Sequence, residues 1–196
     1  AAVIVGGGWL FVKNRSRAGG EEAFALLFQA EKVEQSAAKE AEAQGGDVLK
    51  VMTTWGADKK KDYEDKLSKV IQEYPKTAAA AVAGLRLGRF RYAEGRFPEA
   101  ADAFKGVADR VTTDDYVVYK AMALDSLATT FEAQKNIEEA RKTFEAALGL
   151  KDNPLKPLAY LGQARSLKQL GKKDEAKAAY EKVIQEFPGS PYARKA

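Results

Sequence analysis

The sequence predicts an all-α protein, a right-handed solenoid in which helix hairpins stack side by side. Three observations predict this fold class. A pattern of small and aromatic residues recurs along the second half of the chain, helix-favouring Ala, Leu, Glu and Lys are abundant, and glycine or proline separates the expected helices. A repeat with a period of roughly 20–50 residues is typical of arrays in which each unit buries its apolar face against its neighbours.

Composition excludes several kinds of chemistry. The 196 residues contain no cysteine and no histidine, so disulfides, thiolate nucleophiles, Cys/His metal sites and imidazole acid–base catalysis are absent. The triplet Gly6-Gly7-Gly8 has no following Lys-Ser/Thr and is therefore no phosphate loop. We expect a protein that is not an enzyme and that binds no cofactor and no metal.

The net charge also limits the kinds of partner. The chain has 32 basic and 28 acidic residues, a net charge of +4 that is spread along its length. The basic residues do not interleave with aromatic residues in a stripe, so we expect no nucleic-acid binding.

The first element is an apolar segment. Residues 1–12 (AAVIVGGGWLFV) carry no charge, and Lys13, Arg15 and Arg17 follow directly. The run is shorter than the roughly 20 residues that cross a bilayer, and it is expected to be the C-terminal part of a longer transmembrane anchor covering residues 1–18. Trp9 and Phe11 would lie at the membrane interface with the three basic side chains. A buried element of the soluble fold is the competing interpretation.

Leading helices are expected over residues 21–57. A long helix extends from Glu21 to Gln44 and ends at Gly45-Gly46, and a short helix follows with Asp47 as its N-cap. Residues 58–80 then carry one helix of a degenerate repeat unit. Its charged beginning, residues 58–66 (DKKKDYEDK), is typical of a solvated helix start.

Residues 81–196 contain three repeat units and a C-terminal extension. The segment KVIQEYP at 69–75 returns as KVIQEFP at 182–188. Each unit has a turn and then a small residue, and an aromatic residue stands four positions after that residue. The small residues are Ala100, Ala140 and Ala176, which are 40 and 36 residues apart. The aromatic residues are Phe104, Phe144 and Tyr180.

The first helix of each unit carries a small residue at a fixed place. Gly88, Ala128 and Ala164 occupy it, and a larger side chain there would force the two helices of a hairpin apart. One turn later the pattern requires a bulky residue. Phe131 and Leu167 meet that requirement, whereas the first unit has Arg91, for which the neighbouring Phe90 or Tyr92 could substitute.

These residues resemble the tetratricopeptide repeat (TPR). The resemblance covers residues 81–114, 121–154 and 157–190, with 58–75 similar to the second helix of a further unit. An anchor, a long helix and the segment YPKTA at 74–78 before three units together resemble the YfgM family of bacterial inner-membrane proteins. That resemblance implies a single-pass anchor, a periplasmic TPR-like domain, and an association with the Sec translocon and periplasmic chaperones.

In TPR proteins the first helices of the units line a concave face that binds protein partners. By motif register, the face would hold an apolar part at the helix starts and a charged part towards their ends, which suits an extended peptide or an amphipathic helix. The expected residues are Val82, Leu85, Arg89, Tyr92, Met122, Asp125, Thr129, Glu132, Leu158, Leu161, Arg165 and Lys168. An ordinary solvated face is the competing interpretation. None of the three helices offers an asparagine for a carboxylate-clamping set.

Two functions follow as hypotheses. The first is a membrane-tethered scaffold for protein–protein interactions at the bacterial inner membrane, with its soluble domain in the periplasm and a role ancillary to translocation or chaperoning. The second is a structural subunit of a larger cell-envelope or membrane machine of the assembly, secretion or motor type. The sequence leaves open the identity of the partner, the membrane orientation and the oligomeric state.

Overall fold

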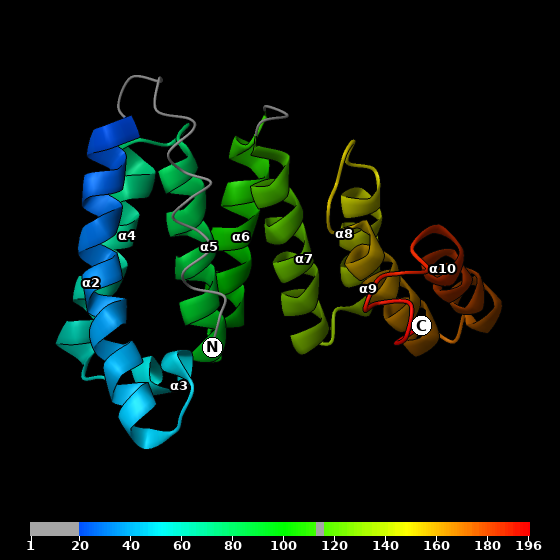
Figure 1. Cartoon of the computed structure of the whole chain (residues 1–196), viewed down its shortest axis with the longest axis horizontal. Helices are drawn as coiled ribbons and strands as arrows, with labels where there is room; N and C mark the ends of the chain where they lie inside the picture. Colours follow the sequence, from blue (N-terminus) through cyan, green and yellow to red (C-terminus); the bar gives the residue numbers. More distant parts are fainter. Residues whose placement is uncertain (1–19, 113–115) are drawn as a thin grey trace.

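The computed structural model describes residues 20–112 and 116–196, and within these ranges the chain is helical throughout its regular structure. The helices stand side by side in one row, and α9 and α10 are tilted relative to α2 (Figure 1). The nine helices of the described ranges are α2 (Gly20–Gln44), α3 (Val48–Thr53), α4 (Ala57–Glu73), α5 (Ala78–Ala93), α6 (Phe97–Arg110), α7 (Val117–Ala133), α8 (Ile137–Leu148), α9 (Lys156–Gln169) and α10 (Lys173–Glu186). Each consecutive pair from α4 to α10 is in contact, as in a repeat array.

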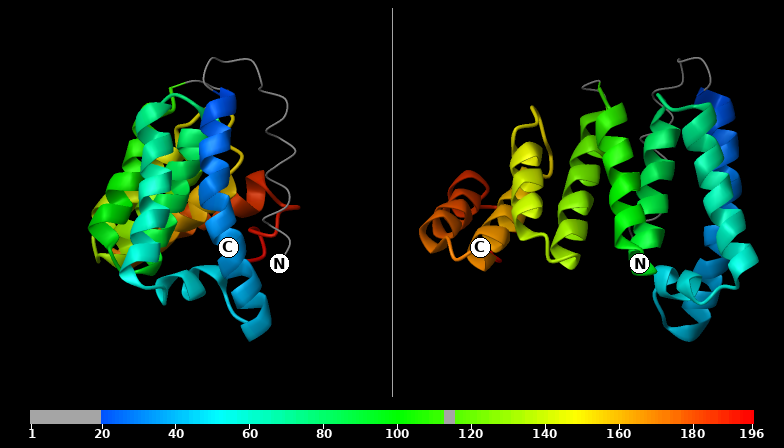
Figure 2. Two further views of the ribbon diagram at one scale, coloured as in Figure 1. Left: turned by 90° about the vertical axis from the view of Figure 1, so that its left-hand side faces the viewer. Right: turned by 180° about the vertical axis from the view of Figure 1, so that it is seen from behind.

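At the N-terminal end, α2 and α4 lie side by side, and the short helix α3 lies in the connection between them (Figure 2). The predicted cap of α3 is present, because the Asp47 carboxylate accepts a hydrogen bond from the backbone N–H of Lys50 at 3.1 Å. Gly45 ends α2 with a φ of +62°, a conformation that glycine adopts without strain. Because the chain turns back after Gly45 and through α3, the long leading helix α2 packs against α4.

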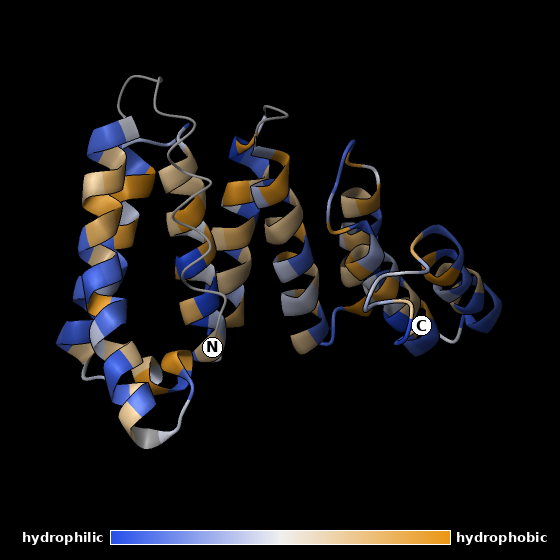
Figure 3. Cartoon of the chain, in the orientation of Figure 1, coloured by the Kyte–Doolittle hydropathy of each residue, from blue (hydrophilic) through white to orange (hydrophobic). Residues whose placement is uncertain are grey.

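The repeats pack through the small residues that the sequence indicates. A Cβ atom added at Gly88 on α5 would stand 2.5 Å from the Phe104 ring on α6, so only glycine allows this approach. Gly162 on α9, which was not among the expected small residues, allows a similar approach, because a Cβ atom there would meet the Phe144 ring on α8 at 2.3 Å. Of the expected packing residues, Ala100, Phe104, Ala140, Phe144 and Ala176 are buried, whereas Tyr180 is only half-buried. Along each helix, hydrophobic and hydrophilic stretches alternate, which is typical of helices with one buried side (Figure 3).

The three hairpin turns share one backbone geometry. In each, the second residue after the first helix lies in the left-handed region, at Gly95 (φ +75°), Lys135 (φ +65°) and Gly171 (φ +78°). The next N–H in each turn bonds to the carbonyl five residues back, as from Arg96 to Arg91 at 2.9 Å. This is the Schellman arrangement, which favours glycine. The middle turn uses lysine in the same conformation.

Arg91 does not fill the bulky position of its unit by packing. Phe90 is fully buried, contacting Tyr63 edge-on at 5.3 Å between ring centroids, while Arg91 reaches back to α4 and donates to Glu64 at 2.6 and 2.9 Å. Of the two substitutes that the sequence suggested, Phe90 therefore provides the apolar contact. Arg91 provides an ion pair at this place in the first unit.

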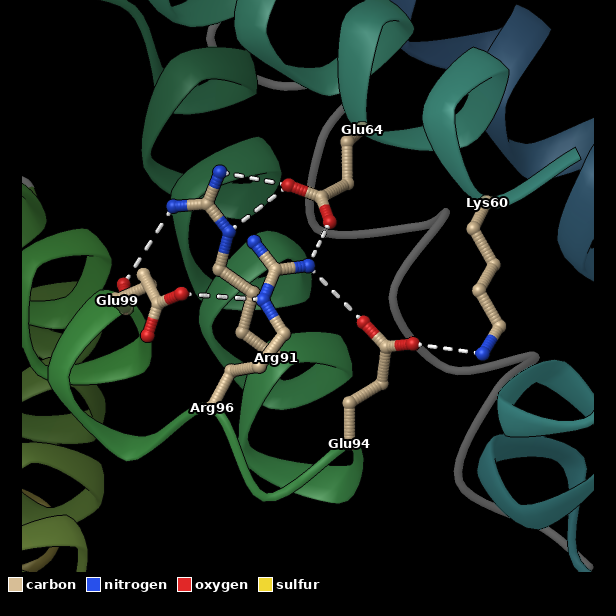
Figure 4. Close-up of polar contacts among 6 residues, drawn as sticks. All are labelled: Lys60, Glu64, Arg91, Glu94, Arg96 and Glu99. Carbon is tan, nitrogen blue, oxygen red and sulfur yellow. Dashed lines mark hydrogen bonds and ion pairs between the residues drawn. The ribbon is translucent and has the colours of Figure 1, made fainter. Parts of the chain in front are cut away.

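That ion pair belongs to a network between α4, α5 and the start of α6 (Figure 4). Arg96 also pairs with Glu64, and it contacts Glu94 at 3.1 Å and Glu99 at 3.3 Å. Lys60 completes the network at Glu94, 2.8 Å away. The hydrogen bond to Glu64 is the largest contribution that raises the pKa of Arg96 above its usual range. The region at the start of α4 that was expected to be merely solvated thus helps to hold α5.

The expected membrane anchor lies outside the described residues, as do Trp9, Phe11, Lys13, Arg15 and Arg17. Within residues 20–112 and 116–196, none of the helices combines the length and the hydrophobicity that crossing a bilayer requires.

Candidate functional site

The first helices of the hairpins, α5, α7 and α9, contact one another in sequence and form one face of the array. Between α5 and α7 this face is hollowed by a pocket of about 230 Å³. Its lining residues are Leu49, Arg89, Tyr92, Ala93, Phe104, Asp125, Ser126 and Thr129. Four of the twelve residues expected on the concave face, Arg89, Tyr92, Asp125 and Thr129, therefore lie together around one hollow.

Two charged side chains of this pocket have no close partner among the described residues. Arg89 is exposed and makes no ion pair or hydrogen bond there, although its charge acts at longer range on Tyr63. Asp125 is half-buried and likewise makes no hydrogen bond or ion pair. Burial raises the pKa of Asp125 to about 6; the more distant charge of Arg165 lowers that pKa, and the charge of Glu132 raises it.

Glu132 and Arg165, also expected on this face, bind each other. The guanidinium of Arg165 on α9 donates to both carboxylate oxygens of Glu132 on α7, at 2.8 and 2.6 Å. Ser166 adds a hydrogen bond to Glu132 at 3.4 Å, and Arg165 lies 5.8 Å from the centroid of the Phe144 ring. A two-point pair of this kind fixes geometry as well as adding energy. These two residues therefore join neighbouring units.

The other expected residues are buried, half-buried or exposed. Leu85 and Leu161 are buried, with 6% and 9% of their surface exposed, so they are core residues beneath the face. Met122 is 41% exposed, which is unusual for a large apolar side chain, and it extends the apolar part of α7 beyond the pocket. Val82 and Leu158 are half-buried and Lys168 is exposed.

Sequence reasoning missed four pocket residues. Leu49 comes from α3, in the connection between α2 and α4, and nothing in the repeat register places that connection near α7. Phe104 belongs to the buried aromatic series, yet the neighbouring Gly88 leaves its ring close to the face. Ala93 and Ser126 are direct sequence neighbours of the expected Tyr92 and Asp125, and a wider reading of the same helix face could have included them.

A larger hollow, of about 480 Å³, lies where the turn before α5 meets the end of α6, and Pro75, Thr77, Arg110 and Tyr116 are among its lining residues. We assign no role to it, because none of the residues expected on the concave face lines it. In the described part of the chain, no three acidic side chains gather in a way that would hold a metal ion. A third hollow, of about 390 Å³, lies along α10 and includes Lys168, the one residue of the expected face in its lining. Because the pocket between α5 and α7 gathers four of the expected residues, it is the candidate site.

Two segments match the family described as the tetratricopeptide repeat, residues 158–190 and residues 123–154. They cover the α9–α10 hairpin and nearly all of the α7–α8 hairpin. No curated protein sequence is similar enough to the chain to count as a relative.

Solved structures share the fold at low sequence identity. A Podosopora anserina kinesin light chain protein of nearly identical TPR-like repeats aligns with a TM-score of 0.54 at 15% identity, covering 86% of this chain and 96% of that one. BtubC (BKLC) from P. vanneervenii has a TM-score of 0.55 at 12% identity, covering 86% and 93% of the two chains. MamA AMB-1 has a TM-score of 0.53 at 18% identity, covering 94% and 96%.

At these identities the likeness to solved structures concerns the fold alone. The matched repeats and the shared helical array agree with the small-residue and aromatic packing described above. TPR repeat proteins are typically non-enzymatic scaffolds. Residues 123–154 and 158–190 of the chain are tetratricopeptide repeats, the kind of repeat that serves as a scaffold for protein–protein interactions.

Proposed function

We propose that the face formed by α5, α7 and α9 binds a segment of a partner protein, with the pocket between α5 and α7 at its centre. One observation carries the proposal: Arg89 and Asp125, from neighbouring helices, line the same hollow without a close partner for either charge. Buried or half-buried polar groups are normally paired, so the unpaired carboxylate of half-buried Asp125 in a concave place is typical of a surface completed by a ligand.

The surroundings of the pocket support a polypeptide as the ligand. Val118 and Met122 are exposed apolar side chains on α7, and half-buried Leu158 lies on α9. An apolar part beside a polar part would fit the alternating side chains of an extended segment or one side of an amphipathic helix. At about 230 Å³ the pocket is smaller than the roughly 300–1,000 Å³ of small-molecule sites. It would receive one side chain of a longer segment.

We further propose where in the cell this binding takes place. A tether at the bacterial inner membrane, with the TPR domain in the periplasm and an ancillary role in translocation or chaperoning, is supported by the apolar run at residues 1–12 and the basic residues after it. The order of elements that resembles the YfgM family supports the same location. Fractionation of cells that express the full-length gene would test the tether, because release of the protein by salt or carbonate alone would contradict it.

Site-specific photo-crosslinking tests the binding face. A photoreactive phenylalanine analogue at Met122 or Leu158 should capture partner protein, because both positions lie on the first helices of their units. The same analogue at Lys105 on α6 or Glu145 on α8 is the matched control, since both side chains are exposed on second helices. Equal capture from the two sets of positions would contradict binding at the proposed face.

A fixed subunit of a larger membrane machine is the second candidate. Leu170 and Ile184, 36% and 47% exposed, leave apolar surface at the C-terminal end of the array, where another subunit could pack. A scaffold should purify as a stable protein and exchange its partners, whereas a fixed subunit should precipitate or unfold when its complex is absent. Sedimentation and melting of the isolated protein separate the two.

A further inference from the structure

We propose that the pocket between α5 and α7 selects a partner segment in which an apolar residue stands next to an arginine or lysine, with Asp125 pairing with the basic side chain. This inference rests on the proposed function, because it specifies the chemistry of the segment that the face would bind. Charge complementarity and the apolar floor of the pocket determine the choice.

The apolar residue follows from the floor and walls. Leu49, Ala93 and the ring of Phe104 contribute hydrocarbon surface from three different helices, and the hollow they border is about 230 Å³. Water in such a place makes few hydrogen bonds, so an apolar side chain that displaces it gains free energy. The size admits a single large side chain, which gives the segment one anchoring position.

The basic residue follows from the difference between the two unpaired charges. Asp125 is half-buried, so its carboxylate has already lost part of its hydration and gains more from a partner cation than an exposed group would. Arg89 is exposed and keeps its hydration, and a pair made at such a surface position contributes little. The carboxylate therefore has the larger influence on which segment binds.

The charged side chains around Asp125 leave its carboxylate without a cation to pair with among the described residues. Arg89 faces the pocket from α5, Glu132 follows on the same helix as Asp125, and Arg165 faces it from α9. Arg165 is engaged in its two-point pair with Glu132, so these two side chains largely neutralise each other. Among the described residues, none lies within ion-pair distance of the Asp125 carboxylate, and a cation from the partner would occupy that place.

Protonation should control this recognition. The pKa of Asp125 is raised to about 6 by burial, so the carboxylate is charged at pH 7.5 and mostly neutral at pH 5. A basic partner residue binds the charged form, and its affinity should fall as the pH decreases through 6. A partner with glutamine in place of the basic residue should show no such fall.

Selection of random nine-residue peptides displayed on phage, with the full-length chain as bait, tests the inference. Enriched peptides are expected to place leucine, isoleucine, phenylalanine or methionine beside arginine or lysine. Asp125→Asn should weaken a selected peptide at least tenfold at pH 7.5 and remove its pH dependence, whereas Asp102→Asn, the same change at an exposed position on the second helix α6, should leave its affinity within about threefold. Replacing the basic residue of the peptide by glutamine should abolish the difference between wild type and Asp125→Asn.

The outcomes separate this inference from the proposed function. Enrichment of acidic or uncharged peptides, or dependence on Arg89 without dependence on Asp125, would overturn the charge selection and leave groove binding intact. Ala93→Trp fills the pocket from an exposed position without altering either charge. Peptides that bind this variant as well as wild type, or a failure to enrich any peptide, would overturn the proposed function itself.

Discussion

The two ends of the array are held together by different interactions. From α7 to α10, helices approach closely over buried small residues, and Phe144 lies where Gly162 of the next unit leaves room for it. From α2 to α5, buried alanines on α2 and α5 pack beside larger buried rings, and several polar contacts also join the helices. Tyr63 on α4 donates a hydrogen bond to Glu34 on α2, and Arg86 on α5 pairs with Glu31 at 2.7 Å.

This comparison of the two ends shows which contacts between helices can be recognised from a repeated sequence pattern. The small-residue and aromatic positions recur because each unit meets its neighbour through the same surfaces. The N-terminal helices α2 and α4 lie outside the three repeat units, so their contacts follow no period. Their polar contacts are instead the pairs of Glu64 with Arg91 and Arg96 and the Tyr63–Glu34 hydrogen bond.

Phe144→Ala should have the largest effect. The ring is fully buried between α8 and α9, and its removal should lower the free energy of unfolding by about 3–5 kcal/mol. Phe28→Ala on α2 is the control, because that ring is 47% exposed and its loss should cost less than about 1 kcal/mol. Chemical denaturation followed by circular dichroism measures both. Similar losses would mean that the regular units are not held by their aromatic series.

Glu64→Gln should have an intermediate effect at the other end of the array. The carboxylate accepts from both Arg91 and Arg96 at a position where 15% of the side chain is exposed, so its neutralisation should cost about 1–2 kcal/mol. Glu145→Gln removes an exposed partner of Arg141 and should cost less than about 0.5 kcal/mol. If the two variants melt alike, the N-terminal end does not depend on its ion-pair network.

Lys135→Gly should have the smallest effect and the opposite sign. Lys135 has a φ of +65° in a turn where the other two hairpins have glycine, so relief of backbone strain should raise stability by about 0.5–1 kcal/mol. Gln134→Gly, next to it with a φ of −78°, is the control and should lower stability. A lower melting temperature for Lys135→Gly would show that the lysine makes a compensating contact.

The sequence predicted the fold well where packing repeats and less well where it does not. Ala140 and Phe144 were identified as packing residues from their spacing alone, and the cap at Asp47 from residue type. The pairing of α2 with α4 and the contribution of Leu49 to the pocket could not be predicted, because they depend on how a non-repeating connection folds back.

The candidate site could be predicted to the level of a helix face. Motif register indicated the side of α5 and α7 that carries Arg89 and Asp125. It could not separate these from Leu85, which is buried one turn away, nor show that Arg165 would pair with Glu132. Those distinctions depend on side-chain contacts between units, for which a single sequence holds no periodic signal.

The central claim is that the face formed by α5, α7 and α9 binds protein segments through the pocket at Arg89 and Asp125. Nitrogen-15 TROSY spectra of the protein, recorded while a selected peptide is added, test it most directly. We expect the largest shifts at backbone amides near Arg89, Asp125 and Thr129, with little change along α6 and α8. Shifts concentrated on the second helices, or on the apolar C-terminal end around Ile184, would contradict it.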